Sequence, residues 1–234
     1  MLKSFAALAL RRLRSSDAIN CHGQQLSQIT KIWFTPLPKD SKWIAPCQMH
    51  YVENGKEKIR DIVKLYDGVL VVVYNISRKK LVYVRQFRPA VYHGILAGNT
   101  LEIPKEEVDL MHFPPELGVT LEPCAGVVDK TKSLADIASE EVREECGYHV
   151  PADKMERIFE FRSGVGASSA ALTFFYCEVC DEQKVSDGGG TGDEAIQVVE
   201  LSIDEAKTLV QKGATLNSGP GTIIGTLWFL CNKI

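Results

Sequence analysis

The chain has 234 residues, of which 45% are hydrophobic and 24% are charged, and its formal net charge is −3. These values are ordinary for a globular protein, and they argue against a general nucleic-acid-binding surface, which needs clustered basic charge. No apolar run approaches the roughly 18 residues of a membrane-spanning helix. We therefore expect one globular domain with a short appendage, and neither nucleic acid nor a membrane as its partner.

Residues 1–27 form an N-terminal extension with a composition of its own. It begins MLKSFAALALRRLRSS, which holds four basic side chains and several serines, and no acid precedes Asp17. A basic amphipathic helix of this composition is typical of a mitochondrial transit peptide. The alternative is an extension of a cytoplasmic protein. We expect a cytoplasmic location, with import into mitochondria through residues 1–25 as the alternative.

The seven cysteines are scattered, and their number is odd. A disulfide framework is therefore not expected, and a reducing compartment is indicated. Cys177 and Cys180 form a single CxxC without a second pair or a nearby histidine. We interpret them as two thiols at the end of a strand and not as a zinc site.

Strands dominate the first half of the domain. Asn54-Gly55 lies between two alternating segments of QMHYVENGKEKIRDIV, which predicts a β-hairpin. The β-branched run VLVVVYN is typical of a strand buried on both faces, and LVYVRQF predicts the strand that pairs with it. Residues 94–120 are rich in glycine and proline and predict a long loop, a feature that is often functional.

The second half begins with a predicted strand, VTLEPCAGVV. The best helix of the chain follows in TKSLADIASEEVREECGY, where Ser133 and Asp136 form a capping-box pattern and Gly147 is a natural C-cap. Strands are predicted at 157–162 and 171–180. A glycine-rich loop (SDGGGTGDE), a strand (AIQVVEL), a helix (SIDEAKTLVQKG) and a closing helix within GTIIGTLWFLCNKI complete the chain.

Four carboxylates crowd into EEVREECGY at the end of the best helix. At about 100° per residue, Glu141 and Glu145 fall within the apolar arc of the helix, Glu144 borders it and Glu140 lies outside. Uncompensated buried carboxylates are costly, so a partner must neutralise them. Arginines or a solvated acidic face are alternatives, but a cation such as Mg²⁺ neutralises several carboxylates at once. In the preceding PCAGVV, Gly126 lets the backbone approach a ligand closely.

These residues resemble a known signature. Gly126 followed by EVREECGY from Glu141 is similar to the Nudix box, G-x5-E-x7-R-E-U-x-E-E-x-G-U, where U is a bulky apolar residue, and the spacing is that of the family. The segments QFRPAVY, CAGVVD and EECGYH resemble the nucleoside-diphosphate-sugar pyrophosphatase branch, most of all its UDP-glucose group. The resemblance covers residues 28–232.

The resemblance implies a fold and a reaction for residues 28–234. The fold is α+β, the Nudix α/β/α sandwich with a mixed β-sheet, and an N-terminal β region, residues 28–63, builds a homodimer. The reaction is Mg²⁺-dependent hydrolysis of nucleoside-diphosphate sugars, chiefly UDP-glucose to UMP and glucose 1-phosphate, with Mn²⁺ as an alternative metal. Alternatives are an ADP-ribose or ADP-sugar pyrophosphatase, or a catalytically impaired nucleotide-sugar binder.

The resemblance also implies roles for single residues. The metal ligands are the carbonyl of Ala125 and the carboxylates of Glu141, Glu144 and Glu145. Arg88 binds the substrate. The catalytic residues are Glu194, as general base, and Glu144. The glycines at positions 188–190 and 192 would let the loop that carries Glu194 close over the substrate as a lid.

Two positions depart from the Nudix box. The box arginine is replaced by Glu140, and the first box glutamate is replaced by Lys132, so both charges are inverted. One hypothesis is that Lys132 or Arg143 takes over part of the orienting role of the box arginine. The other is reduced activity. We favour retained activity because every predicted metal ligand is present.

Overall fold

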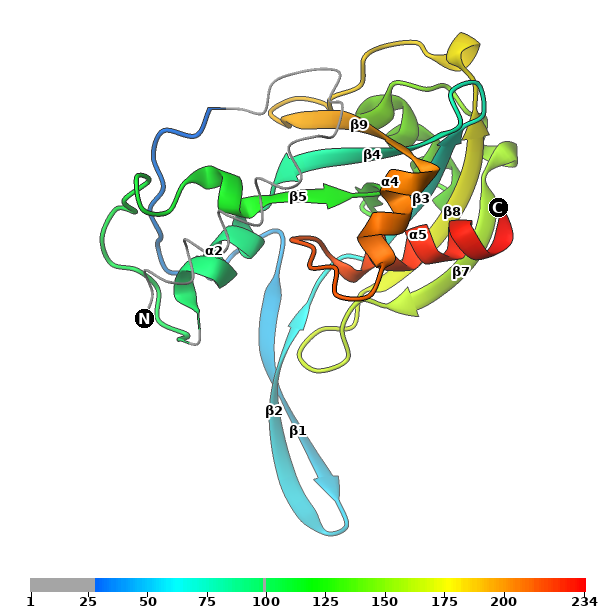
Figure 1. Cartoon of the computed structure of the whole chain (residues 1–234). Helices are drawn as coiled ribbons and strands as arrows, with labels where there is room; N and C mark the ends of the chain where they lie inside the picture. The colour runs from blue at the N-terminus through cyan, green and yellow to red at the C-terminus, as the bar shows by residue number, and fades with distance from the viewer. Residues whose placement is uncertain (1–27, 99) are drawn as a thin grey trace.

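The computed structural model describes residues 28–98 and 100–234, so the predicted N-terminal extension lies outside the described residues. A mixed seven-stranded sheet forms the body, with the strand order β5-β4-β3-β8-β7, and β6 pairs with β3 while β9 pairs with β4 (Figure 1). Strands β3 and β8 run parallel, and the other neighbouring pairs run antiparallel. None of the described helices is both long enough and apolar enough to cross a membrane.

The elements have the following bounds. The strands of the sheet are β3 (Gly68–Asn75), β4 (Lys80–Phe87), β5 (Val119–Glu122), β6 (Cys124–Val127), β7 (Glu156–Arg162), β8 (Ala171–Val179) and β9 (Ile196–Ser202). A separate hairpin consists of β1 (Ala45–Glu53) and β2 (Lys56–Lys64). The helices are α2 (Pro89–Ala97), α3 (Leu134–Glu141), α4 (Ile203–Val210) and α5 (Pro220–Asn232).

Strand β3 is buried on both faces, as its β-branched run predicts. Val69, Val71 and Val73 belong to the core that includes Ile137 and Ala138 of α3. The alternate side chains of β3 belong to a second core on the other face, under α4 and α5. Helices therefore cover both faces of the sheet, and the predicted α/β/α sandwich is confirmed (Figure 1).

The prediction of one continuous strand in VTLEPCAGVV is wrong. The segment divides at Pro123 into β5, which pairs with β4, and β6, which pairs with β3. Proline has no N–H to donate to a strand ladder, so pairing stops there and the chain changes partner. In the β6 register Ala125 lies opposite Leu70 and Gly126 opposite Val69, so the break brings Gly126 to the start of β3.

The carboxylate-rich helix changes type before it ends. The Ser133 hydroxyl accepts a hydrogen bond of 3.1 Å from the Asp136 N–H, which confirms the predicted N-cap. Helix α3 stops at Glu141, and Val142–Cys146 form one π-helical turn that ends at Gly147, whose φ is 79°. A π turn inserts a residue into the helical repeat and often marks a functional site. Regular helical periodicity does not predict it.

The predicted loop over 94–120 is partly helical. Helix α2 occupies Pro89–Ala97, with a proline at its first position, where the missing N–H costs nothing. From residue 100 the chain is irregular until the short 3₁₀ turn Pro115–Gly118. Tyr92, Val108 and Leu117 bury a small core of their own in this region. The loop is therefore shorter than predicted and is anchored by its own packing.

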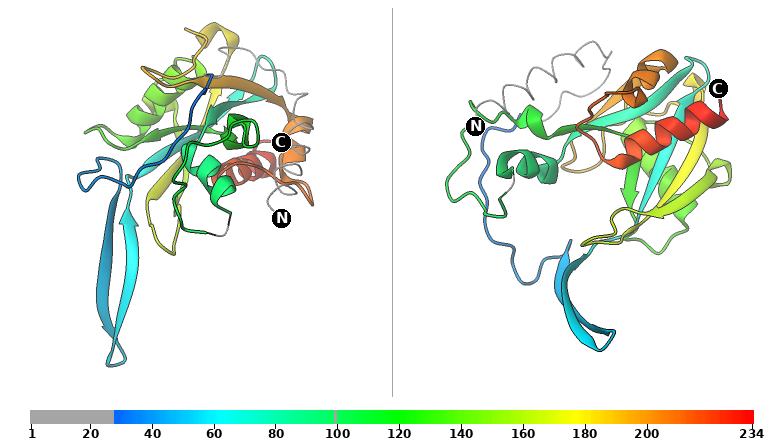
Figure 2. Two further views of the ribbon diagram at one scale, coloured as in Figure 1. Left: turned by 90° about the vertical axis from the view of Figure 1, so that its left-hand side faces the viewer. Right: turned by 60° about the horizontal axis from the view of Figure 1, so that its bottom comes forward.

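The hairpin β1–β2 projects from the body of the protein (Figure 2). Its turn has positive φ at Asn54 (54°) and Gly55 (74°), the conformation that an Asn-Gly turn predicts. Met49, Val52 and Ile59 are exposed apolar side chains on the two strands. A two-stranded hairpin without a covered face is at best marginally stable in water.

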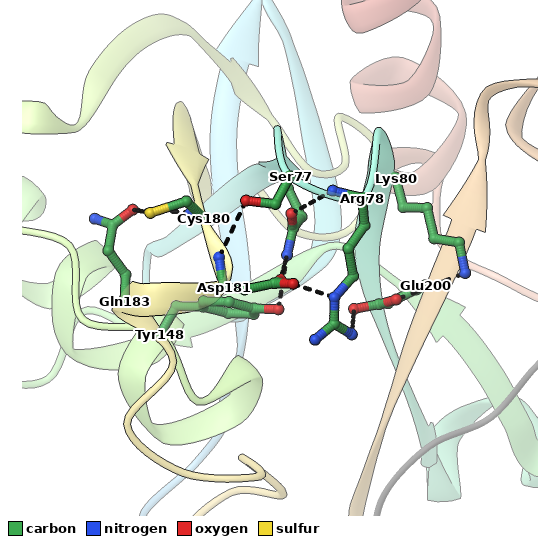
Figure 3. Close-up of polar contacts among 9 residues, drawn as sticks. Ser77, Arg78, Lys80, Tyr148, Cys180, Asp181, Gln183 and Glu200 are labelled. Atoms are coloured by element: carbon green, nitrogen blue, oxygen red, sulfur yellow. Dashed lines mark hydrogen bonds and ion pairs between the residues drawn. The ribbon is translucent and has the colours of Figure 1, made fainter.

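A polar network fixes the turn that joins β3 and β4 (Figure 3). The Arg78 guanidinium lies between two carboxylates, 2.7 Å from Asp181 Oδ1 and 2.7 Å from Glu200 Oε1. The Asn75 amide donates to the Tyr148 hydroxyl at 3.1 Å and to Asp181 at 2.9 Å. The network therefore links the ends of three strands to the residue that follows the π turn.

The glycine-rich loop lies directly against the π turn. The N–H groups of Gly189 and Gly190 donate to the carbonyls of Glu145 (2.9 Å) and Glu144 (3.1 Å). A Cβ atom at Gly188, whose φ is +71°, would lie 2.2 Å from the Glu145 carbonyl oxygen. These glycines therefore permit close backbone contact, a role different from the predicted freedom of a lid.

We predict that Gly188→Ala lowers the free energy of unfolding by roughly 3 kcal/mol, because it adds both a steric overlap and an unfavourable positive φ. The matched control is Gly192→Ala, which has a positive φ but no atom within 4 Å of the added Cβ. It should cost roughly 1 kcal/mol. Urea unfolding measures the free energy of unfolding of both variants. Equal losses in the two variants would contradict the role of Gly188 in the close contact with the π turn.

Candidate active site

Glu145 is the most deeply buried of the predicted metal ligands. The residue is 4% exposed, and its Oε2 atom accepts a hydrogen bond of 3.0 Å from the backbone N–H of Ala125. Burial raises the pKa of Glu145 to about 8, although the hydrogen bonds from Ala125 and the Cys124 thiol act in the opposite direction. The helical wheel therefore predicted the inward direction of Glu145 correctly.

Glu141 lies against the box glycine. A Cβ atom placed on Gly126 would be 2.3 Å from both Cγ and Oε1 of Glu141, so only glycine leaves room for this carboxylate. The residue is half-buried, and its burial, followed by the charge of Glu144, raises its pKa to about 7. The sequence predicts a close approach of the Gly126 backbone to a ligand. In the structure the Gly126 backbone lies close to Glu141, which is itself a predicted metal ligand.

The two predicted catalytic carboxylates lie at the edge of this group. Glu144 is half-buried on the π turn, and its charge raises the pKa of Glu141. Glu194 is exposed, and its Oε2 atom accepts a hydrogen bond of 2.9 Å from the Thr191 N–H. The charge of Glu194 also raises the pKa of Glu141, which places the loop carboxylate within electrostatic reach of the ligands.

Arg88 follows the last residue of β4 and precedes α2. Its Nε and Nη2 atoms donate to the two carboxylate oxygens of Glu122, at 2.8 and 2.6 Å. The hydrogen bonds to Glu122 are the main cause that raises the pKa of Arg88, and Glu145 and Glu194 contribute through their charges. Arg88 is thus a cation whose charge acts on the predicted residues Glu145 and Glu194.

Sequence reasoning missed Glu122. Burial acts to raise the pKa of its carboxyl group, but hydrogen bonds from Arg88 and Thr120 and the charge of Arg88 outweigh burial, so the pKa lies below its usual value. Strand periodicity gives no sign of this pair, because its members are 34 residues apart. The available signal was a glutamate in a strand that is otherwise short of charge.

The donor set fits a hard divalent cation. Among the described residues, no three acidic, histidine or cysteine side chains already surround a common point as a metal centre would require. Mg²⁺, however, retains several waters and usually takes only one or two carboxylates from the protein. Glu141 and Glu145, whose ionisation is made costly by burial, could supply those two beside the backbone of Ala125 and Gly126.

The two inverted box charges meet each other. The Lys132 ammonium contacts Glu140 Oε1, and the Lys130 ammonium lies 3.5 Å from Glu140 Oε2. Lys132 therefore pairs with the residue next to Glu141, and Arg143 is exposed. The hypothesis that Lys132 or Arg143 takes over part of the orienting role of the box arginine stays a prediction.

No family model matches the chain. The UDP-glucose pyrophosphatase NUDT14 of Bos taurus is 37% identical over 198 residues, which cover 81% of this chain and 89% of the relative. NUDT14 of Mus musculus is 35% identical over 203 residues, which cover 83% and 91%. A GDP-mannose pyrophosphatase of Shigella flexneri is 31% identical over 160 residues, which cover 67% and 72%.

The chain belongs to the Nudix sugar-nucleotide pyrophosphatases. The family predicted from the Nudix box and the prediction of an enzyme are both confirmed by these relatives. The mixed-sheet α+β fold of this Nudix pyrophosphatase agrees with the membership.

We predict that Glu140→Arg lowers the activity of this Nudix pyrophosphatase roughly two- to fivefold, the range expected for one exposed ion pair. The substitution would place three cations together and release the loop before α3. The double variant Lys132→Glu, Glu140→Arg restores opposite charges and should regain most of the activity. Sugar-nucleotide hydrolysis rates measure both. A large gain in turnover in Glu140→Arg alone would mean that the natural site is impaired.

Proposed function

We propose that the protein hydrolyses the diphosphate bond of nucleoside-diphosphate sugars, and that its preferred substrate is UDP-glucose, which yields UMP and glucose 1-phosphate. Diphosphate hydrolysis is common to the names of both groups of relatives, and the UDP-glucose enzymes match over the larger share of this chain. The observation that carries the proposal is the packing of Glu145 and Glu141 against the backbone of Ala125 and Gly126. The charges of Arg88 and Glu194 act on this group.

In this proposal Arg88 binds the diphosphate. A guanidinium offers its N–H donors in a planar fork that matches two phosphate oxygens. Glu194 takes the proton of the attacking water, since its exposed carboxylate can reach a water molecule that a buried one cannot. Glu144, half-buried on the π turn, is the second candidate for this step.

We also propose Mg²⁺ as the cofactor, with Mn²⁺ as the alternative. Glu141, Glu144, Glu145 and the carbonyl of Ala125 would hold it. When bound, such a cation neutralises phosphate charge and makes a coordinated water more acidic. The protein itself contributes two carboxylates that are already desolvated and costly to ionise without a cation nearby.

We predict Mg²⁺-dependent hydrolysis of UDP-glucose, with UMP and glucose 1-phosphate as products, faster than that of GDP-mannose or ADP-ribose. Glu145→Gln should lower kcat about a hundredfold, because it removes a charge that the site needs to hold the metal. The matched control is Glu200→Gln, since Glu200 is similarly buried (7% exposed) but pairs with Arg78 and Lys80.

Product analysis by chromatography separates the candidates. AMP release from ADP-ribose as the fastest reaction would favour the ADP-ribose alternative, and fastest cleavage of GDP-mannose would favour the function named for the bacterial relatives. Thermal stabilisation by UDP-glucose without any turnover would identify an impaired nucleotide-sugar binder and overturn the proposal.

We further propose that the protein is a homodimer built through residues 28–63. Trp33 and Trp43 are 61% and 65% exposed in this region, and Val52 on the hairpin is 72% exposed. Large exposed apolar side chains in one region are a feature of interaction surfaces, and the projecting hairpin needs a covered face for stability. A second copy would supply that cover.

Val52→Asp tests the dimer, since the side chain is exposed in the single chain and the fold should tolerate a charge there. We predict a shift from dimer to monomer, measured by sedimentation velocity over a range of concentrations. The control is Met111→Asp, which places the same charge at an even more exposed apolar site (92%) outside the hairpin. An unchanged dimer, or a wild-type monomer, would contradict the proposal.

A further inference from the structure

The Arg88–Glu122 pair is built more precisely than a surface ion pair. Both carboxylate oxygens of Glu122 accept hydrogen bonds from Arg88, and the Glu122 side chain is only 15% exposed. The Thr120 hydroxyl donates to Glu122 Oε1 at 2.5 Å and is itself buried. The carboxylate is therefore held by the Thr120 hydroxyl as well as by the arginine.

The pair leaves one edge of the guanidinium available. A guanidinium has five N–H donors. Glu122 takes two of them, one on Nε and one on Nη2, which leaves three, and two of these, one on Nη1 and one on Nη2, lie along the outer edge. Among the described residues this outer edge has no further hydrogen bond. It retains the two-nitrogen fork that binds a pair of phosphate oxygens.

The backbone holds both members of the pair in place. Glu122 lies opposite Val84 in the β4–β5 register, and Arg88 follows the end of β4. The Arg88 N–H donates to the Gly118 carbonyl at 2.8 Å, at the point where β5 begins. The pair therefore spans two neighbouring strands, and the arginine gives up its rotational freedom before any ligand arrives.

We propose that Glu122 is a positioning residue for substrate binding, which holds the Arg88 guanidinium so that its outer edge faces the diphosphate. This inference rests on the proposed role of Arg88 in the site. It gives Glu122 a function beyond stabilising the sheet. It also explains why Glu122 lies beside an arginine that must attract an anion. The Glu122 carboxylate binds the inner edge of the Arg88 guanidinium and leaves the outer edge for the anion.

A thermodynamic cycle tests the proposal. The wild type, Glu122→Gln, Arg88→Ala and the double variant are compared in two measurements: the Kd of methylene diphosphonate with Mg²⁺ by calorimetry, and KM and kcat for UDP-glucose. We expect Glu122→Gln to weaken diphosphonate binding about tenfold, as for one lost charge-assisted hydrogen bond, and to raise KM more than it lowers kcat. In the Arg88→Ala background the same substitution should change Kd less than twofold.

A purely structural role of Glu122 gives a different result. In that case Glu122→Gln would weaken binding equally in both backgrounds, or would lower the unfolding temperature without a change in Kd, and either outcome overturns the proposal. Thr120→Val keeps the strand shape and removes only the hydroxyl. It should weaken binding in the same direction by a smaller factor, and it keeps the proposal testable if Glu122→Gln does not fold.

The matched control is Glu200→Gln, which weakens a second contact between an arginine and a glutamate of this sheet, at Arg78 (Figure 3). It should lower the unfolding temperature and leave the Kd of methylene diphosphonate unchanged. If Arg88→Ala leaves that Kd unchanged while UDP-glucose is still hydrolysed, the positioning role fails and the proposed function stands. If the cycle behaves as expected but no sugar nucleotide is hydrolysed, the proposed function fails alone.

Discussion

The contact between β6 and the end of α3 is the interaction on which the rest of the site depends. The Ala125 N–H holds the Glu145 carboxylate, and the bare backbone of Gly126 makes room for Glu141. Each contact fails if either segment moves by the width of a methyl group. The proline break at Pro123, the π turn and the docked glycine loop all serve to bring these two segments together, because each sets the position of one of their ends.

This contact brings together carboxyl groups that burial makes costly to ionise. Burial raises the pKa values of Glu141 and Glu145, and Arg88 is already shared with Glu122. By contrast, the buried Glu200 has both Arg78 and Lys80 as partners (Figure 3). Because burial makes Glu141 and Glu145 costly to ionise, a divalent cation beside them would favour their charged forms, as the proposed metal site requires.

Features carried by local pattern could be predicted from the sequence. The central β3 strand, the Asn54-Gly55 hairpin, the Ser133 cap and the inward direction of Glu145 each depend on neighbours a few residues away. The break at Pro123, helix α2 and the π turn were missed, because tertiary pairing decides between forms that the local sequence allows equally. Glu122 was missed for the same reason, since its partner lies 34 residues away and only the sheet register brings them together.

Lys132 and Glu140 differ from the Nudix box in residue type but still form an ion pair. Compared with the Nudix box, both positions carry the wrong charge, and each alone suggests a damaged site. In the structure they contact each other, and an ion pair is unchanged in sign when both of its charges are exchanged. The loop before α3 is thus tied to the helix position next to Glu141 as an unexchanged pair would tie it. The two departures are therefore one compensated change, and they leave Glu141, Glu144 and Glu145 in place.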